Sequence, residues 1–352
     1  MIPIIDEEDL IIKKDGWMMN KKRSIIFFIL VIILIAVLFW INIILGSTSV
    51  STSDILKILA GDRADAMSTS IIMSIRFPRT VSAFLLGGAL ALSGYLLQTF
   101  FGNPIVGPFV LGISSGAKLS VAIFMIFFLS IGREMGLNMM VLSAFIGASL
   151  AMVFVLIISI KVKSMSVLVV CGIMIGYICS AITDFVVTFA DDSNIINLHN
   201  WSMGSLSGVN WDEIKVITVI VLVSIIMTLT ILKPMNAYRL GEEYARSVGI
   251  NISFLRAMLI FISSLLAACV TAFAGPISFV GIAVPHLVRQ CLKTDSSYVM
   301  IPASFLGGAA ITLFCDLIAR TVFAPTEVSI SSVTAVFLVP VVIVMMLKRS
   351  RD

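Results

Sequence analysis

The chain has 352 residues, of which 59% are hydrophobic and 12% are charged, and its formal net charge is +4. A soluble domain carries roughly 25% charged residues and about 45–50% apolar residues, so this composition excludes a soluble enzyme. The small net charge does not indicate nucleic acid as a partner. The five cysteines lie in or beside apolar runs and form no CxxC pair, which favours buried apolar side chains over a metal site or a disulfide framework.

Ten apolar segments are predicted to cross a membrane, because each approaches the ~20 residues that span a bilayer core. In chain order they are residues 25–45, 80–99, 112–131, 139–160, 166–189, 214–232, 254–274, 278–292, 299–319 and 328–347. The eighth is short and contains Pro285, so its full crossing is left open. Residues 1–24 are interpreted as a partly disordered cytoplasmic tail. The first apolar run is interpreted as a retained span, because it is longer than the apolar core of a signal peptide.

The basic residues predict the orientation of the chain. If both ends are cytoplasmic, the inner segments hold 16 lysines and arginines, the outer segments hold 7, and Lys118 lies within a span. This bias follows the positive-inside rule. Several glycines within the spans are placed for a close approach of two helices. They are Gly87, Gly88, Gly94, Gly172, Gly176, Gly307 and Gly308.

A short helix is predicted in the longest internal cytoplasmic loop, residues 233–256. Glu243, Ala245 and Gly249 have the spacing of a short helix that is closed by a glycine. Between two spans, such a helix presents a compact knob to a cytoplasmic partner. The alternative at this point is a solvated loop helix without a partner.

The sequence predicts no catalytic site. Residues 112–118 resemble a P-loop, but they lack the Gly-Lys-Ser/Thr element and open an apolar span where a P-loop follows a strand. His199 and His286 are the only histidines of the sequence, and no carboxylate pair or nucleophile accompanies them. We therefore expect this chain to be no enzyme and to bind no metal or cofactor.

Many short motifs, in a fixed order along the chain, carry a resemblance to a known family. The earlier ones are RFPR at 76–79, ALALSG at 89–94, Gln98, NP at 103–104 and LGISSGA at 111–117. The later ones are WSMG at 201–204, GVNW at 208–211, KPMN at 233–236, LGEE at 240–243, FVG at 279–281, VPHLVR at 284–289 and DLIAR at 316–320. Together they resemble the permease subunits of type II ATP-binding cassette (ABC) importers for iron-siderophores, haem and cobalamin, over residues 25–350.

This resemblance implies an all-α integral membrane protein of about ten transmembrane helices, with short cytoplasmic coupling helices between spans 6 and 7. It implies a location in the bacterial plasma (inner) membrane. The implied partners are a second permease subunit, two cytoplasmic ATPases that use ATP and Mg, and an external substrate-binding protein. The implied cargo is a metal chelate, with a ferric siderophore first and haem or cobalamin as the other candidates. The choice of chelate, and that between a homodimer and a heterodimer, stay open.

The resemblance also implies roles for particular residues. The coupling segment, about residues 236–252, would enter a cleft on the ATPase. Its residues are Leu240, Gly241, Glu242, Glu243, Ala245, Arg246 and Gly249. The cytoplasmic gate would lie at Met165 and Ser166, at the start of the helix that lines the translocation path. Met165 departs from the family, which often has a small polar residue there.

Three arginines are expected on the outer side, where the positive-inside rule disfavours basic residues. They are Arg76, Arg79 and Arg320, and Asp316 precedes Arg320 by four residues, a spacing that lets the acid orient the arginine on one helix face. Snorkelling toward lipid phosphates is the alternative explanation. The resemblance implies that these arginines bind acidic residues of the external binding protein.

Two charged residues fall inside predicted spans, where charges are costly and usually face a cavity or a partner. Lys118 and Asp184 are predicted at different depths, so we do not expect them to pair. Asp184 is expected to face the external part of the translocation path. An alternative function uses Asp184 as the ion site of a secondary transporter that is driven by an ion gradient.

Overall fold

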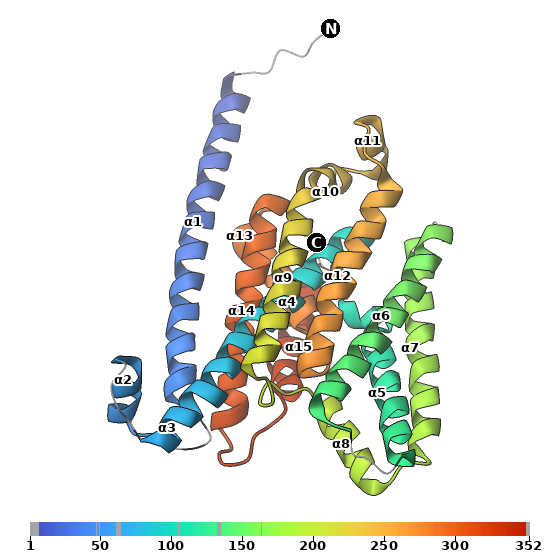
Figure 1. The fold of residues 1–352 in the computed structure, drawn as a ribbon. Helices are drawn as coiled ribbons and strands as arrows, with labels where there is room; N and C mark the ends of the chain where they lie inside the picture. The colour runs from blue at the N-terminus through green and yellow to red at the C-terminus, as the bar shows by residue number, and fades with distance from the viewer. Residues whose placement is uncertain are drawn as a thin grey trace.

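A computed structural model gives the fold (Figure 1), and it describes residues 7–46, 48, 50–60, 65–104, 106–131, 135–162 and 164–349. Within these residues the regular secondary structure is helical and contains no strand. In chain order the helices are α1 (Glu7–Ile44), α2 (Thr52–Ala60), α3 (Ala66–Ser70), the π-helix η1 (Ile71–Arg76), α4 (Phe77–Phe101), the 3-10 helix η2 (Pro108–Leu111), α5 (Ile113–Ser130), α6 (Leu137–Lys161), α7 (Met165–Val187), α8 (Asp192–Ser202), α9 (Trp211–Thr230), α10 (Leu232–Arg239), α11 (Glu242–Ser247), α12 (Ile252–Ala274), α13 (Val280–Leu292), α14 (Ser297–Thr321) and α15 (Ile330–Arg349).

Each of the ten apolar segments predicted from the sequence forms a helix. Seven helical stretches are long and apolar enough to cross a membrane. They lie in α1, in α3 to α4, and in α6, α7, α9, α12 and α14. The apolar parts of α5, α13 and α15 are shorter, at 10–17 residues. The chain therefore has the build of a multi-pass membrane protein, while ten full crossings and two cytoplasmic ends stay predictions.

The first helix begins earlier than the sequence suggested. α1 starts at Glu7, within the segment expected to be a partly disordered tail, and it runs without a break into the apolar part that begins at Ile25. Residues 7–24 contain no proline and several glutamate and lysine residues, which are good helix formers. The polar tail can therefore continue the helix of the first span. Residues 1–6 of the predicted tail lie outside the described residues.

Local capping signals explain where several helices begin and end. α9 starts with a capping box, in which the Asn210 side chain accepts from the backbone N–H of Glu213 and Glu213 accepts from the backbone N–H of Asn210. The Asn251 side chain accepts from the backbone N–H of Phe254 and starts α12. α4 ends at Gly102, which has the left-handed backbone conformation (φ 60°) that glycine adopts readily.

α4 lies at the centre of the molecule and packs against α9, α12, α13 and α14. Nearly all its residues from Leu86 to Phe101 are buried. Two glycine contacts allow this packing. A Cβ atom at Gly94 would lie 1.7 Å from the carbonyl oxygen of Gly281 in α13, and one at Gly87 would lie 2.7 Å from the carbonyl oxygen of Gly308 in α14. The prediction that these α4 glycines permit close helix approach is confirmed.

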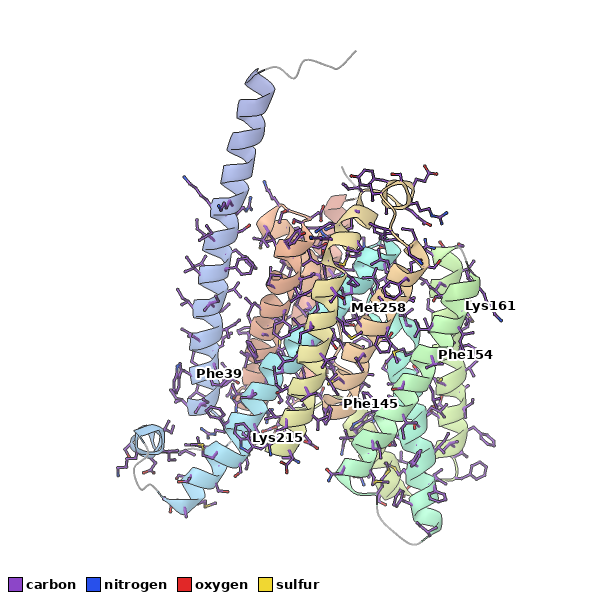
Figure 2. All side chains as sticks on the ribbon, turned by 45° about the horizontal axis from the view of Figure 1, so that its top comes forward. Phe39, Phe145, Phe154, Lys161, Lys215 and Met258 are labelled. Atoms are coloured by element: carbon purple, nitrogen blue, oxygen red, sulfur yellow. The ribbon has the colours of Figure 1, made fainter. Side chains whose placement is uncertain are left out.

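Helices α5, α6 and α7 form a second group beside this centre. α5 packs against both α6 and α7, and α6 packs against α12. In Figure 2, Phe154 and Lys161 mark α6 and Met258 marks the neighbouring α12. α7 presents a broad face of apolar side chains that this chain leaves exposed. They include Val167, Val170, Met174, Tyr177, Ile178, Ile182 and Phe185.

The short helices lie at opposite ends of the long ones. α10 and α11 stand at one end, together with the end of α6 at Lys161 and the early part of α1 (Figures 1 and 2). α2, α3 and α8 lie at the other end. The connection between α9 and α12 therefore projects from the same end of the molecule as the α6–α7 connection, in which the gate was predicted.

Candidate functional site

The segment between α9 and α12 forms the short helix that the sequence predicted. α11 begins after Gly241, whose φ is 130°, and ends in two hydrogen bonds that close a Schellman motif. The backbone N–H of Ile250 donates to Ala245 at 3.0 Å, and that of Gly249, with φ 85°, donates to Arg246 at 3.0 Å. The prediction of a helix closed by Gly249 is confirmed.

The surface of α11 separates into one inward contact and several outward side chains. Ala245 is fully buried, because it faces the other helices of this chain. Leu240, Glu243 and Tyr244 are exposed, and so is Val248. The segment is therefore a projecting knob whose apolar and acidic outer side chains are free to meet another molecule.

Glu242 joins α11 to the helix that follows it. Its carboxylate lies 2.6 Å from Arg246 within α11 and 2.7 Å from Arg256 in α12. The Arg256 side chain is 20% exposed and that of Arg246 is 66% exposed, so the partly buried pair is the stronger of the two. The hydroxyl of Tyr238 lies 3.5 Å from Arg256 Nε and donates to the carbonyl of Phe100, at the end of α4, at 3.4 Å.

A second cluster holds α10 against α13 and α14. Asp295 forms ion pairs with Arg239 at 2.8 Å and with Arg289 at 2.7 Å, so one carboxylate joins two guanidinium groups. The hydroxyl of Tyr95 lies 3.4 Å from Arg239 and 3.0 Å from Ser297 Oγ. Burial alone lowers the pKa of Arg239, but Tyr95 and Asp295 outweigh it, so the pKa lies above its ordinary value and the guanidinium stays charged.

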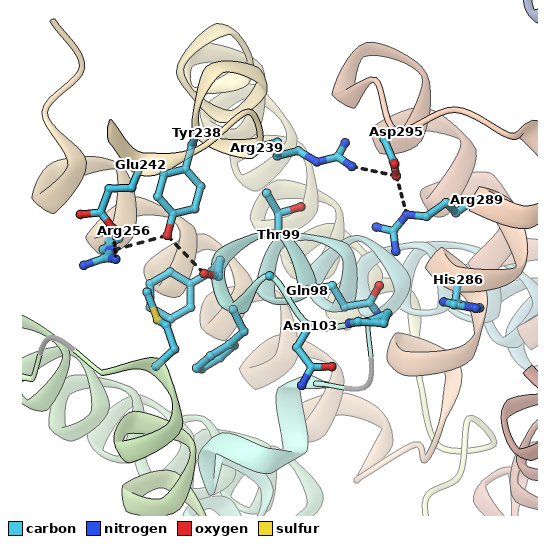
Figure 3. A pocket seen from close by; sticks show the side chains of 15 residues that line it. Gln98, Thr99, Asn103, Tyr238, Arg239, Glu242, Arg256, His286, Arg289 and Asp295 are labelled. Carbon is cyan, nitrogen blue, oxygen red and sulfur yellow. Dashed lines mark hydrogen bonds and ion pairs between the residues drawn. The ribbon is translucent and has the colours of Figure 1, made fainter. Parts of the chain in front are cut away.

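These two clusters surround a polar cavity of about 640 Å³ (Figure 3). In the figure the Glu242, Arg256 and Tyr238 group lies on one side and the Arg239, Asp295 and Arg289 group on the other. Met165 also lines this cavity. The remaining lining comes mainly from the end of α4 and from α13. It comprises Gln98, Thr99, Phe100, Phe101, Gly102, Asn103, Pro104 and His286.

The structure brings one of the predicted gate residues to the coupling segment. Met165 is the first residue of α7, is half-buried and faces the cavity that Arg239 and Glu242 also line. Ser166 is the next residue and is exposed. Sequence reasoning did not place Met165 beside the coupling segment, because the two are far apart in the chain and only the packing of the helices brings them together.

Asp184 lies away from this cavity. It is exposed on α7, near the opposite end of that helix from Met165. Lys118 is half-buried on α5. Neither side chain forms an ion pair with any described residue, in agreement with the prediction that the two do not pair.

The three arginines expected on an outer docking surface are instead buried within this chain. Arg76 is 3%, Arg79 5% and Arg320 2% exposed. Arg76 donates to the backbone carbonyls of Ile43 at 2.9 Å and Ile44 at 2.6 Å. Arg76 also donates to the backbone carbonyl of Thr48, just after α1. These internal acceptors account for the burial of Arg76, and docking of a binding protein at the three arginines stays a prediction.

Asp316 forms ion pairs with both of the other two arginines. Arg79 binds it at 2.9 Å and binds Glu327 at 2.8 Å, and Arg320 lies 3.7 Å from the second oxygen of Asp316. Arg320 also donates to the backbone and side-chain oxygens of Asn42 in α1. Asp316 and Arg320 form an ion pair, as their i, i+4 spacing suggested, but the hydrogen bonds of the Arg320 guanidinium go to Asn42. The i, i+4 spacing revealed this pair, whereas no sequence signal pointed to Asn42 or Glu327 as partners.

Among the described residues, no group of three or more histidine, cysteine, aspartate or glutamate side chains is arranged to hold a metal ion. The arrangement at the α10–α11 end is instead one of ion pairs that connect separate helices. Ion pairs of this kind can transmit a displacement of one helix to another.

Comparisons with known proteins identify the family. Residues 33–348 match the FecCD transport family. The chain is 34% identical over 294 residues to the vitamin B12 import system permease protein BtuC of Salmonella newport, covering 84% of this chain and 89% of BtuC. It is 33% identical over 266 residues to the hemin transport system permease protein HmuU of Yersinia pestis, covering 75% of this chain and 79% of HmuU.

Solved structures show the same fold. A metal-chelate type ABC transporter in an inward-facing conformation superposes with a TM-score of 0.80 at 28% identity, covering 92% of this chain and 99% of that one. PsaBC from Streptococcus pneumoniae, in complex with Fab, superposes with a TM-score of 0.51 at 16% identity, covering 75% of this chain and 87% of that one, a likeness of fold alone. Because the family match extends over nearly the whole sequence, the chain belongs to the FecCD transport family.

Proposed function

We propose that this chain is the membrane-spanning permease subunit of an ABC importer for metal chelates. The observation that carries the proposal is the family match over residues 33–348, together with relatives that are named as permeases for vitamin B12 and for hemin. The cargo of this chain is a metal chelate of that general class, with cobalamin, haem or a ferric siderophore as the candidates. ATP hydrolysis belongs to a separate subunit.

The knob at α11 is proposed as the contact with a cytoplasmic ATPase. Two features support this role: its outward side chains are exposed in the described part of the chain, and Glu242 ties the knob to α12 through Arg256. A displacement of α11 by the ATPase would reach α12 through this ion pair. It would reach the end of α4 through Tyr238. The proposed coupling residues are Leu240, Gly241, Glu242, Glu243, Ala245, Arg246 and Gly249.

The translocation path is proposed to follow α7, with the cytoplasmic gate at Met165 and Ser166. The support is that Met165 faces the same cavity as Arg239 and Glu242, so a movement of the coupling segment changes the surroundings of the gate directly. Asp184 is proposed to face the outer part of the path, because α7 presents it on a face that this chain leaves uncovered.

The proposed partners are a second permease subunit against the exposed face of α7, two cytoplasmic ATPases and an external substrate-binding protein, in a bacterial inner membrane. Docking of the binding protein at Arg76, Arg79 and Arg320 remains a prediction. Such docking would require these side chains to exchange internal partners for external ones, because each is nearly fully buried in the isolated chain. The alternative of a transporter driven by an ion gradient is not supported by the relatives, which are permeases of import systems.

The test is reconstitution of the permease with its ATPase and binding protein in proteoliposomes. We expect uptake of a metal chelate that requires ATP and that persists when proton and sodium gradients are collapsed. Replacing Asp184 with asparagine should change the rate or the preference among chelates, but not the energy source. Uptake by the permease alone, driven by an ion gradient and lost in the Asp184→Asn variant, would contradict the proposal.

A further inference from the structure

A groove of about 400 Å³ lies between α6 and α9, and α12 contributes Phe273 to its wall. The other apolar residues of the groove repeat at helical spacing along the facing sides of α6 and α9. They are Val141, Leu142, Phe145, Val216 and Ile220. In Figure 2, Phe145 and Lys215 mark the two helices on either side of the groove. Because α6 and α9 each contain a stretch long and apolar enough to cross a membrane, we expect the apolar side chains of this groove to face the hydrocarbon region of a bilayer.

One end of the groove is polar, and the polar residues come from the first turns of the two helices. They are Asn138, Asn210, Asp212 and Glu213. Among the described residues, no lysine, arginine or histidine lines the groove. The walls of the groove are therefore apolar along most of its length, and one end carries acidic and amide groups.

The charges at the polar end follow a definite pattern. Glu213 is 9% exposed, and one carboxylate oxygen accepts from the backbone N–H of Asn210 at 2.9 Å. The other oxygen is buried and has no donor among the described residues. The Asp212 carboxylate is exposed and lies 2.7 Å from the ammonium group of Lys215, just outside the groove. Two carboxylates and one ammonium group thus lie within a single turn of α9.

A molecule with an acyl chain and a zwitterionic headgroup complements this pattern. The apolar walls suit an acyl chain, whose burial is favourable in proportion to the apolar area covered. An ammonium group suits the Asp212 and Glu213 carboxylates, and a phosphate suits Lys215. The adjacent Trp211 is 42% exposed, and exposed tryptophan is typical of the level at which headgroups lie.

We propose that this groove binds one phospholipid with a primary ammonium headgroup, of the phosphatidylethanolamine class. Its acyl chain lies along the apolar walls and its ammonium group lies at Asp212 and Glu213. Phosphatidylglycerol carries no cation for the two carboxylates, and phosphatidylcholine carries a cation that cannot donate a hydrogen bond. Binding should therefore be strongest for phosphatidylethanolamine. The proposal rests on the membrane location of the chain and is independent of the proposed transport function.

The experiment is native mass spectrometry of the full-length chain released from nanodiscs that contain equal amounts of the three lipids. The Val216→Trp variant fills the groove. The matched control is Val219→Trp, since Val219 lies on the same helix, is 61% exposed and does not line the groove. Asp212→Asn removes the exposed carboxylate and leaves the apolar walls unchanged.

The wild-type chain should retain phosphatidylethanolamine about two- to fivefold over each of the other lipids, the range that an exposed ion pair provides. Val216→Trp should abolish this retention, Val219→Trp should keep it, and Asp212→Asn should reduce the preference while retaining some lipid. Equal retention of the three lipids by the wild-type chain would overturn the proposal. Equal retention by the two tryptophan variants, or a preference for phosphatidylglycerol, would overturn it as well.

Discussion

Asp316 is the residue on which the buried charges near the start of α4 and the end of α14 depend. Its side chain is 1% exposed and that of its partner Arg79 is 6% exposed. Arg320, one turn further along α14, is also buried. Charges in such surroundings are tolerated only when their partners remain in place. The three residues join α4 to α14, and Arg320 adds α1 through Asn42.

Replacing Asp316 with alanine should strongly destabilise the chain, because two arginines would be left buried without their shared carboxylate. Loss of one partner of a buried ion pair costs about 3–5 kcal/mol. Thermal unfolding in detergent should show a clear fall in the midpoint temperature for Asp316→Ala. The exposed Lys215→Gln variant, which breaks a surface pair, should unfold like the wild type. If the two variants unfolded at the same temperature, Asp316 would not hold this end together.

At the scale of helices, the contact between α4 and α13 depends on the absence of side chains at two glycines. The backbones of Gly94 and Gly281 approach so closely that a methyl group on Gly94 would overlap a carbonyl oxygen. A flexible side chain could move aside, but a backbone carbonyl in a packed helix cannot. The two helices would therefore have to separate.

We expect Gly94→Ala to lower the amount of folded protein in the membrane and its thermal stability. Overpacking of a tight interior costs about 1–3 kcal/mol, and more where the backbone must shift. Fluorescence-detected gel filtration of a tagged chain measures the folded fraction. Gly136→Ala serves as the control, since no described atom lies within 4 Å of a Cβ at Gly136. Wild-type behaviour of Gly94→Ala would show that α4 and α13 are not held this closely.

At the scale of the whole molecule, the proposed transport cycle requires a mechanical link between the α11 knob and the helices around the gate. Glu242 forms one ion pair with Arg246, within α11, and another with Arg256, in α12. The two pairs can therefore be compared. Only the second of these pairs can carry a displacement out of the knob.

Arg256→Gln should therefore reduce chelate uptake per ATP hydrolysed, whereas Arg246→Gln should leave this ratio close to wild type. A coupling energy of 1–3 kcal/mol corresponds to a loss of at least about fivefold. The measurement is the ratio of uptake to phosphate release in the reconstituted complex, with ATPase binding checked by co-purification. Equal ratios for the two variants would exclude the Glu242–Arg256 pair as the link.

Much of the helix pattern could be predicted from the sequence, because apolar length and capping residues are local properties. The ten apolar segments all form helices, and the short α11 ends at Gly249 as the spacing indicated. The environment of Arg76 and Arg79 could not be predicted in this way. Their acceptors, at Ile43 and Glu327, lie far away in the sequence and are brought close only by the packing of α1 and α14 around α4.

The two glycines that flank α11 also bear on how this family can diversify. Gly241 and Gly249 both adopt positive φ, and no described atom lies within 4 Å of a Cβ at either position. Among the described contacts of α11, those of Glu242 with Arg256 and of the buried Ala245 join it to the rest of the chain. Leu240, just before Gly241, and the outward positions Glu243, Tyr244 and Val248 are exposed, so they can change together with a partner surface. If α11 contacts an ATPase as proposed, a few substitutions in these outward positions would change the ATPase partner while the membrane part keeps its sequence.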